Sequence, residues 1–92
     1  FANDSHCMVN LKSATLGVYE KGTGRGVVCS LEGFPYCLIW SKPGVPQFVC
    51  IEPWHSLPSY ESGSIAWEEK PYAARVEPGQ SWKTTLKMQF VR

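Results

Sequence analysis

The stretch TLGVYEKGTGRGVVCSL, residues 15–31, predicts a β-hairpin and with it the fold class. Two runs rich in strand-forming residues, 15–19 and 27–31, flank a segment that contains three glycines. Glycine readily adopts the positive φ angles that tight turns require, so this segment is predicted to be the turn of the hairpin. The glycine spacing is not that of a phosphate-binding loop, and no helix follows it.

Outward from this hairpin, the chain continues as short apolar runs separated by Gly and Pro. The predicted strands are 9–13, 36–40, 48–51 and 82–90. The last of them alternates most clearly, because its apolar side chains fall on one side and its polar side chains on the other. Residues 53–63 have no period and predict a long loop. No stretch shows a helical period with caps, so we expect an all-β fold, an antiparallel β-sandwich of six or seven strands with one buried face.

Length and charge limit the possible partners. The chain has 92 residues, which corresponds to a single domain spanning 1–92. Its formal net charge is +1, so it lacks the basic field that binds a nucleic-acid backbone. Its apolar runs are far shorter than the roughly 20 residues of a membrane span. We therefore expect neither nucleic acid nor membrane as a partner.

The cysteines point to a reducing compartment. Cys29, Cys37 and Cys50 each lie inside an apolar run, where a free cysteine behaves as a small buried hydrophobe, and the fourth is Cys7. Free thiols favour a cytoplasmic protein. The alternative is a secreted domain with two disulfides, for which the even count allows three pairings. No pair of ligands has zinc-site spacing, so no metal is predicted.

Glu52 is the leading candidate for chemistry. It directly follows the apolar run 48–51, and Trp54 and His55 come immediately after it. A carboxylate that is partly removed from water can act as a general base, Trp54 can stack on a sugar ring, and His55 can contact the substrate. Solvent-facing positions for Glu52 and His55 remain alternatives. The spacing selects no carboxylate partner for Glu52 among Glu61, Glu68 and Glu69, and core positions are favoured for Trp40, Trp67 and Trp82.

Five motifs of the chain carry a family likeness. They are Phe34-Pro35-Tyr36, Ile39-Trp40-Ser41-Lys42-Pro43-Gly44 and Phe48-Val49-Cys50-Ile51-Glu52-Pro53-Trp54, together with Glu69-Lys70 and Val76-Glu77-Pro78-Gly79-Gln80-Ser81-Trp82. These motifs resemble those of the aldose 1-epimerase, or galactose mutarotase, family. The resemblance covers the whole chain, but only the C-terminal third of a typical family member. It implies that the chain is the C-terminal part of a galactose-mutarotase-like β-supersandwich.

The resemblance also implies an activity. Family members interconvert the α and β anomers of a free aldose, a hexose monosaccharide, by acid/base ring opening without a metal or a cofactor. Glu52 matches the general base, but neither His6 nor His55 matches the motifs of the histidine acid. We therefore expect a fragment with low or no activity alone, which needs the remainder of the supersandwich or self-associates. The alternative is a non-catalytic carbohydrate-binding β-sandwich module.

Overall fold

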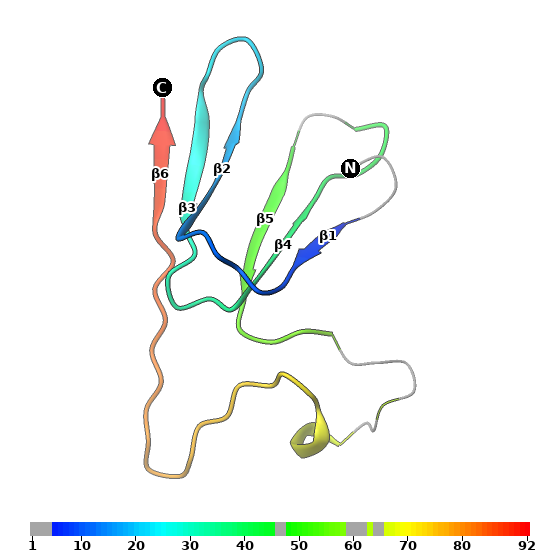
Figure 1. Cartoon of the computed structure of the whole chain (residues 1–92), viewed down its shortest axis with the longest axis vertical. Helices are drawn as coiled ribbons and strands as arrows, with labels where there is room; N and C mark the ends of the chain where they lie inside the picture. Colours follow the sequence, from blue (N-terminus) through cyan, green and yellow to red (C-terminus); the bar gives the residue numbers. More distant parts are fainter. Residues whose placement is uncertain (1–4, 46–47, 59–62, 64–65) are drawn as a thin grey trace.

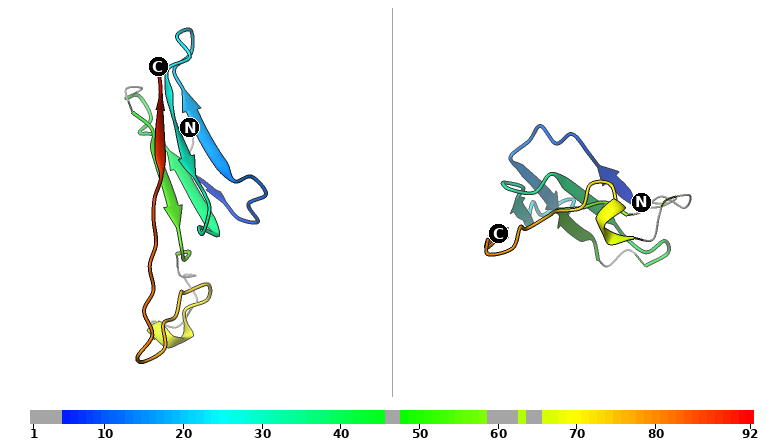
Figure 2. Two further views of the ribbon diagram at one scale, coloured as in Figure 1. Left: turned by 90° about the vertical axis from the view of Figure 1, so that its left-hand side faces the viewer. Right: turned by 90° about the horizontal axis from the view of Figure 1, so that it is seen from below.

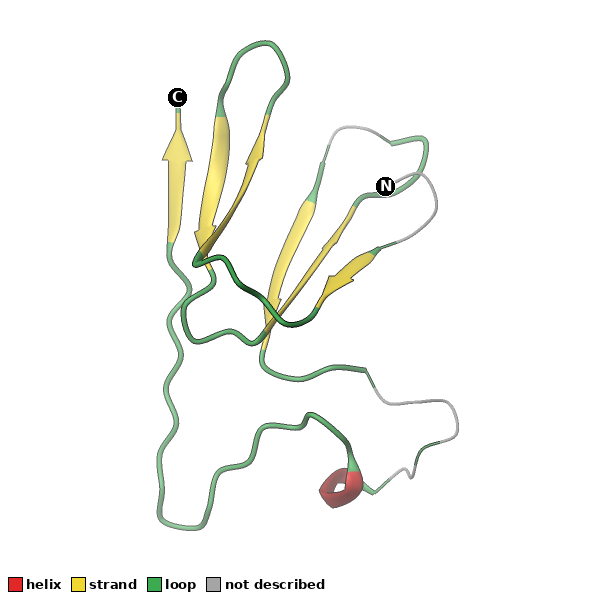
Figure 3. Ribbon diagram, in the orientation of Figure 1, coloured by secondary structure: helices red, strands yellow, loops and turns green. Residues whose placement is uncertain are grey.

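The regular secondary structure of the described residues consists almost entirely of β-strands. In the computed structural model these residues are 5–45, 48–58, 63 and 66–92. The elements are β1 (His6–Met8), β2 (Thr15–Tyr19), β3 (Gly26–Ser30), β4 (Tyr36–Trp40), β5 (Cys50–Trp54), the 3-10 turn η1 (Trp67–Glu69) and β6 (Met88–Val91) (Figure 3). The predicted all-β class is confirmed.

The strands form two antiparallel three-stranded sheets. Their orders are β1-β4-β5 and β2-β3-β6 (Figure 1). Each sheet is built on one hairpin of consecutive strands, β4–β5 or β2–β3, to which β1 or β6 is added at an edge. The antiparallel arrangement predicted from the sequence is therefore confirmed.

The β2–β3 hairpin is the one expected from residues 15–31. Its register runs from the Thr15–Ser30 pair to the Tyr19–Gly26 pair. Gly22 and Gly24 have φ angles of 94° and 73°, as a tight turn requires. Gly26 has a different role, because it already belongs to β3 and a Cβ atom there would lie 2.3 Å from the Val18 carbonyl oxygen. The third glycine is therefore needed for close strand approach.

The two sheets share a small core and are splayed apart. Ile51 on one sheet and Val27 on the other line a common hollow of about 870 Å³. In the left view of Figure 2 the β2-β3-β6 sheet lies in front of the β1-β4-β5 sheet. Among the described apolar residues, only Cys29, Leu31 and Cys37 are buried. The sheets therefore bury little apolar surface against each other.

Three strand predictions are wrong in extent, and one of them, 48–51, is shifted to Cys50–Trp54. No strand covers 9–13, because β1 comes earlier and Asn10 has a φ of 54°, which interrupts an extended chain. The predicted strand 82–90 is reduced to β6, and the segment before β6 is extended but not part of a strand (Figure 1). Its Lys87 carbonyl oxygen still accepts a hydrogen bond from the Ser30 amide at 2.9 Å.

The apolar face predicted to be buried on this last segment is exposed. Met88 is 55% exposed and Phe90 is 73% exposed. Their strand, β6, lies at the edge of its sheet, and Met88 lines the open hollow between the sheets, so the facing sheet covers this apolar side only in part. The alternating pattern correctly identified one apolar side, but burial requires a partner layer.

The predicted loop 53–63 begins later than expected. Pro53 and Trp54 belong to β5, which runs to Trp54, whereas the predicted strand ended at Ile51. Proline is tolerated there because β5 is an edge strand that pairs only with β4. In the described ranges, no helix is long and apolar enough to cross a membrane.

Candidate functional site

Glu52 lies on the outer face of the β1-β4-β5 sheet. In the β4–β5 register it pairs with Leu38, and Trp54 pairs with Tyr36. Since side chains alternate along a strand, Glu52 and Trp54 share one face, opposite to that of Ile51. Ile51 lines the hollow between the sheets, so Glu52 and Trp54 point away from it. The carboxylate therefore lies among aromatic side chains on the outer face.

Trp40 holds this carboxylate directly. Its indole Nε1–H donates a hydrogen bond of 2.6 Å to Glu52 Oε1, and both side chains are half-buried. Trp40 also meets Phe48 edge-on, with 5.7 Å between ring centroids and an interplanar angle of 90°. The Ser41 hydroxyl donates to the Phe48 carbonyl oxygen at 2.6 Å, which closes the loop between the two strands. The β4–β5 hairpin thus holds in place both the Trp40 donor and the Glu52 acceptor.

The sequence predicts a core position for Trp40, and this contact with Glu52 was not predicted. Alternation along the two runs puts both side chains on possible common faces, but pairing them requires the register between two residues 12 positions apart. The other two core predictions are wrong. Trp67 is 81% exposed in η1, and Trp82 is 53% exposed on the extended segment before β6.

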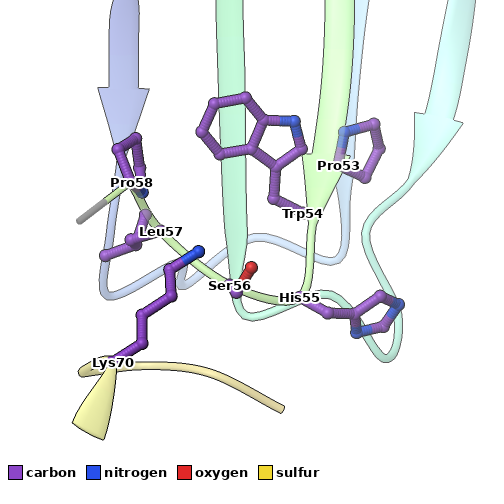
Figure 4. A pocket seen from close by; sticks show the side chains of 7 residues that line it. All are labelled: Pro53, Trp54, His55, Ser56, Leu57, Pro58 and Lys70. Carbon is purple, nitrogen blue, oxygen red and sulfur yellow. The ribbon is translucent and has the colours of Figure 1, made fainter. Parts of the chain in front are cut away.

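Trp54 borders a shallow hollow beyond the end of β5. The hollow has a volume of about 390 Å³ and is lined by residues 53–58 and Lys70. Figure 4 shows the Trp54 indole at one side and the Lys70 side chain extending toward Ser56 and Leu57. Glu52 does not line this hollow, although it shares a strand face with Trp54. Trp54 therefore connects the face of Glu52 with the hollow.

His55 is directed away from Trp54 (Figure 4). Its ring lies 4.4 Å from the Phe34 ring and 4.6 Å from the Trp82 ring, between centroids. Its Nε2 is 2.9 Å from the Thr84 hydroxyl oxygen. Through these contacts His55, at the end of β5, packs against the segment before β6. Contact between His55 and a substrate stays a prediction.

Of the remaining candidate partners of Glu52, Glu68 and Glu69 are exposed in η1, and Glu61 lies outside the described residues. Arg25 forms a 2.8 Å ion pair with Glu20 in the β2–β3 turn. Within the described ranges, no three His, Cys, Asp or Glu side chains gather as a metal site would require.

All four cysteines are free thiols. Cys29 and Cys37 are buried between the sheets, Cys50 is half-buried and Cys7 is exposed. Burial raises the pKa of the Cys37 thiol, because the charged thiolate loses its hydration. The buried thiols thus serve as apolar core atoms.

Two curated proteins of Lactococcus lactis subsp. lactis are similar to this chain. They are protein LacX encoded on a plasmid and protein LacX encoded on the chromosome, each 32% identical over 79 residues. The aligned region is 85% of this chain and 26% of each relative, so the chain spans about a quarter of the length of the curated relatives it matches. No protein-family model matches the chain. No solved structure matches it significantly.

Proposed function

We propose that this chain contributes the general base of an aldose 1-epimerase, with Glu52 as that base. The observation that carries the proposal is the half-buried Glu52 carboxylate, held by Trp40 on an aromatic face of the sheet. Aromatic faces suit the apolar C–H side of a sugar ring, and one fixed carboxylate suits proton transfer to and from a hydroxyl. Trp54 provides the stacking surface beside it.

The reaction requires a base and an acid. Glu52 takes the proton from the anomeric hydroxyl, the C1–O bond to the ring oxygen breaks, and an acid protonates that oxygen. Rotation about the C1–C2 bond and the reverse proton transfers then give the other anomer. The sugar is neither oxidised nor reduced, so the step is balanced without a redox or metal cofactor.

The acid is proposed to come from outside these 92 residues. The chain spans 26% of its curated relatives, and the one described histidine near β5, His55, is directed away from Trp54. We propose that the two sheets form part of a larger antiparallel β-supersandwich that supplies the acid. The free thiols favour a reducing compartment, so we assign the protein to the cytoplasm.

Polarimetry tests the proposal. Freshly dissolved α-D-glucose and α-D-galactose are followed with the 92-residue chain and with the longest reading frame that contains it. Glu52→Gln keeps the size of the side chain and removes its ability to accept the proton, so mutarotation should fall on the order of 10²- to 10⁴-fold. Glu77→Gln, at an exposed turn, is the matched control. Equal rates for the parent and Glu52→Gln would refute the assignment of Glu52.

A carbohydrate-binding module without turnover is the second candidate. The hollow beside Trp54 favours it, since an aromatic ring, a lysine and polar backbone line a surface that could hold a sugar without catalysis. It predicts a change in tryptophan fluorescence on adding sugar, without mutarotation. Trp54→Ala should abolish that change, whereas Trp67→Phe should keep it. No change at high millimolar sugar would dispose of this candidate.

A further inference from the structure

We propose that Trp40 is a positioning residue, which holds Glu52 by Oε1 so that Oε2 accepts the proton of the substrate. This role rests on the function proposed above. It assigns the two carboxylate oxygens different tasks, one structural and one chemical.

The chemistry of the indole group suits this role. Trp40 Nε1–H lies 2.6 Å from Oε1, and a hydrogen bond to an ionised acceptor is short and roughly twice as strong as a neutral one. An indole nitrogen donates only, so it cannot take the proton in place of Glu52. It is also uncharged, so Glu52 keeps its full negative charge. Trp40 can therefore fix the base without neutralising it.

The second carboxylate oxygen of Glu52, Oε2, is not held in this way by a described residue. No described residue donates a hydrogen bond to Glu52 Oε2, whereas Oε1 is occupied by Trp40. A carboxylate that is held at one oxygen loses rotation about its last torsion, which places the other oxygen reproducibly. Oε2 is then the atom available to a hydroxyl of the substrate.

The donor is itself fixed on the hairpin. The Trp40 ring abuts the Phe48 ring at 90°, and Phe48 is held through its carbonyl oxygen by the Ser41 hydroxyl. Both Trp40 and Glu52 lie in paired strands, which are more rigid supports than loops. A continuous series of contacts therefore joins Ser41 in the β4–β5 loop, through Phe48 and Trp40, to the Glu52 carboxylate.

The first test compares the NMR signals of the indole N–H groups in the parent and Glu52→Gln forms of the longest reading frame that contains the chain. The Trp40 signal is assigned by its loss in Trp40→Phe, which keeps an aromatic ring against Phe48. We expect the Trp40 N–H signal to move in Glu52→Gln, because the indole then loses the carboxylate oxygen that it contacts at 2.6 Å. The Trp67 N–H, on an exposed residue, should not respond. A Trp40 signal unchanged in Glu52→Gln would overturn the proposal.

The second test is kinetic and uses the longest reading frame that contains the chain. Trp40→Phe should lower kcat on the order of 10²-fold with KM within about twofold, because a misplaced base slows the chemical step more than binding. A 3-benzothienylalanine at position 40, which has the indole shape without the N–H, should reproduce the loss and exclude a packing effect. Trp67→Phe is the matched control.

The outcomes separate the two proposals. Normal kcat in a folded Trp40→Phe protein would overturn the positioning role and leave Glu52 as the base. Normal mutarotation in Glu52→Gln, or none in the parent, would overturn the proposed function and this role together. Loss of kcat in both position-40 variants, together with a Trp40 N–H signal that moves in Glu52→Gln, would support the role.

Discussion

Glu52 and Glu20 are held by different kinds of donor, and this difference bears on their chemistry. Glu20 accepts hydrogen bonds from the Thr23 hydroxyl and the Arg25 guanidinium in an exposed turn. Glu52 accepts one from the neutral indole of Trp40 on a half-buried face. A cationic partner compensates the charge of a carboxylate, whereas a neutral donor orients it and leaves the charge in place. Glu52 is therefore the better placed of the two to act as a base.

The first prediction concerns the titration of Glu20. The hydrogen bonds from Thr23 and Arg25 lower the pKa of Glu20 below its ordinary value of 4.5. The turn is therefore stabilised above the unfolded pKa, and this contribution is lost as pH falls through the folded pKa. Thr23→Val should move the midpoint upward in an NMR titration of the Glu20 carboxyl carbon. An unchanged midpoint would contradict the assigned cause.

The second prediction concerns the thiols. Because burial raises the pKa of Cys37 and encloses it, Ellman's reagent at pH 8 should label exposed Cys7 quickly and Cys37 only after urea is added. Mass spectrometry of the digested protein locates the label. Native labelling of Cys37 as fast as that of Cys7 would contradict the placement of β4. Fewer than four thiols in urea without reductant would instead support the secreted, disulfide-containing alternative.

At the scale of elements, the local pattern predicted the β2–β3 hairpin well and the extents of β1, β5 and β6 poorly. The β2–β3 hairpin follows from two strand-forming runs and a glycine turn, all within 17 residues of sequence. The start of β1 and the extent of β6 could not be derived in this way, since their partners β4 and β3 lie far away in the chain. Strand ends there depend on long-range pairing rather than on residue type.

Prediction of the candidate site from the sequence is limited in the same way, by contacts between distant segments. Glu52 could be singled out from its apolar neighbours alone, and Trp54 from its position beside it. The partner Trp40 could not, because the contact depends on the register of β4 against β5. The orientation of His55 depends on Phe34 and Trp82, which come from distant segments. Sequence patterns identified chemically suitable residues but not their mutual geometry.

The third prediction tests the close approach of β2 and β3. In Gly26→Ala the new Cβ would lie 2.3 Å from the backbone oxygen of Val18, so the strands must move apart, at a cost of about 1–3 kcal/mol. In Gly17→Ala the nearest atoms belong to the exposed Tyr19 ring, which can rotate away. Urea unfolding should show the larger loss for Gly26→Ala. Equal losses would contradict the role assigned to Gly26.

At the scale of the whole molecule, the two sheets leave much apolar surface uncovered. The hollow between them measures about 870 Å³ and is lined in part by Met88 of β6, and the apolar side chains Met88 and Phe90 remain 55% and 73% exposed. Exposed apolar patches and unpaired strand edges favour association with further strands. This supports the proposal that the two sheets belong to a larger sandwich.

The fourth prediction follows from this surface. The 92-residue chain alone should self-associate at micromolar concentrations, and Phe90→Ser should weaken that association because Phe90 is an exposed apolar side chain of the edge strand β6. Val45→Ser, which removes an exposed apolar side chain from the β4–β5 loop, is the control. Sedimentation velocity distinguishes the species. A monodisperse monomer of the parent chain that melts cooperatively would contradict the prediction.

Anomer exchange at equilibrium is the most direct measure of the proposed activity. Saturation transfer between the α and β anomeric protons of glucose or galactose reports ring opening and closure without a coupled assay. With the longest reading frame that contains the chain, we expect transfer well above the uncatalysed rate, lost in Glu52→Gln and retained in Glu77→Gln. Transfer in Glu52→Gln equal to that of the parent protein would show that Glu52 is not the base.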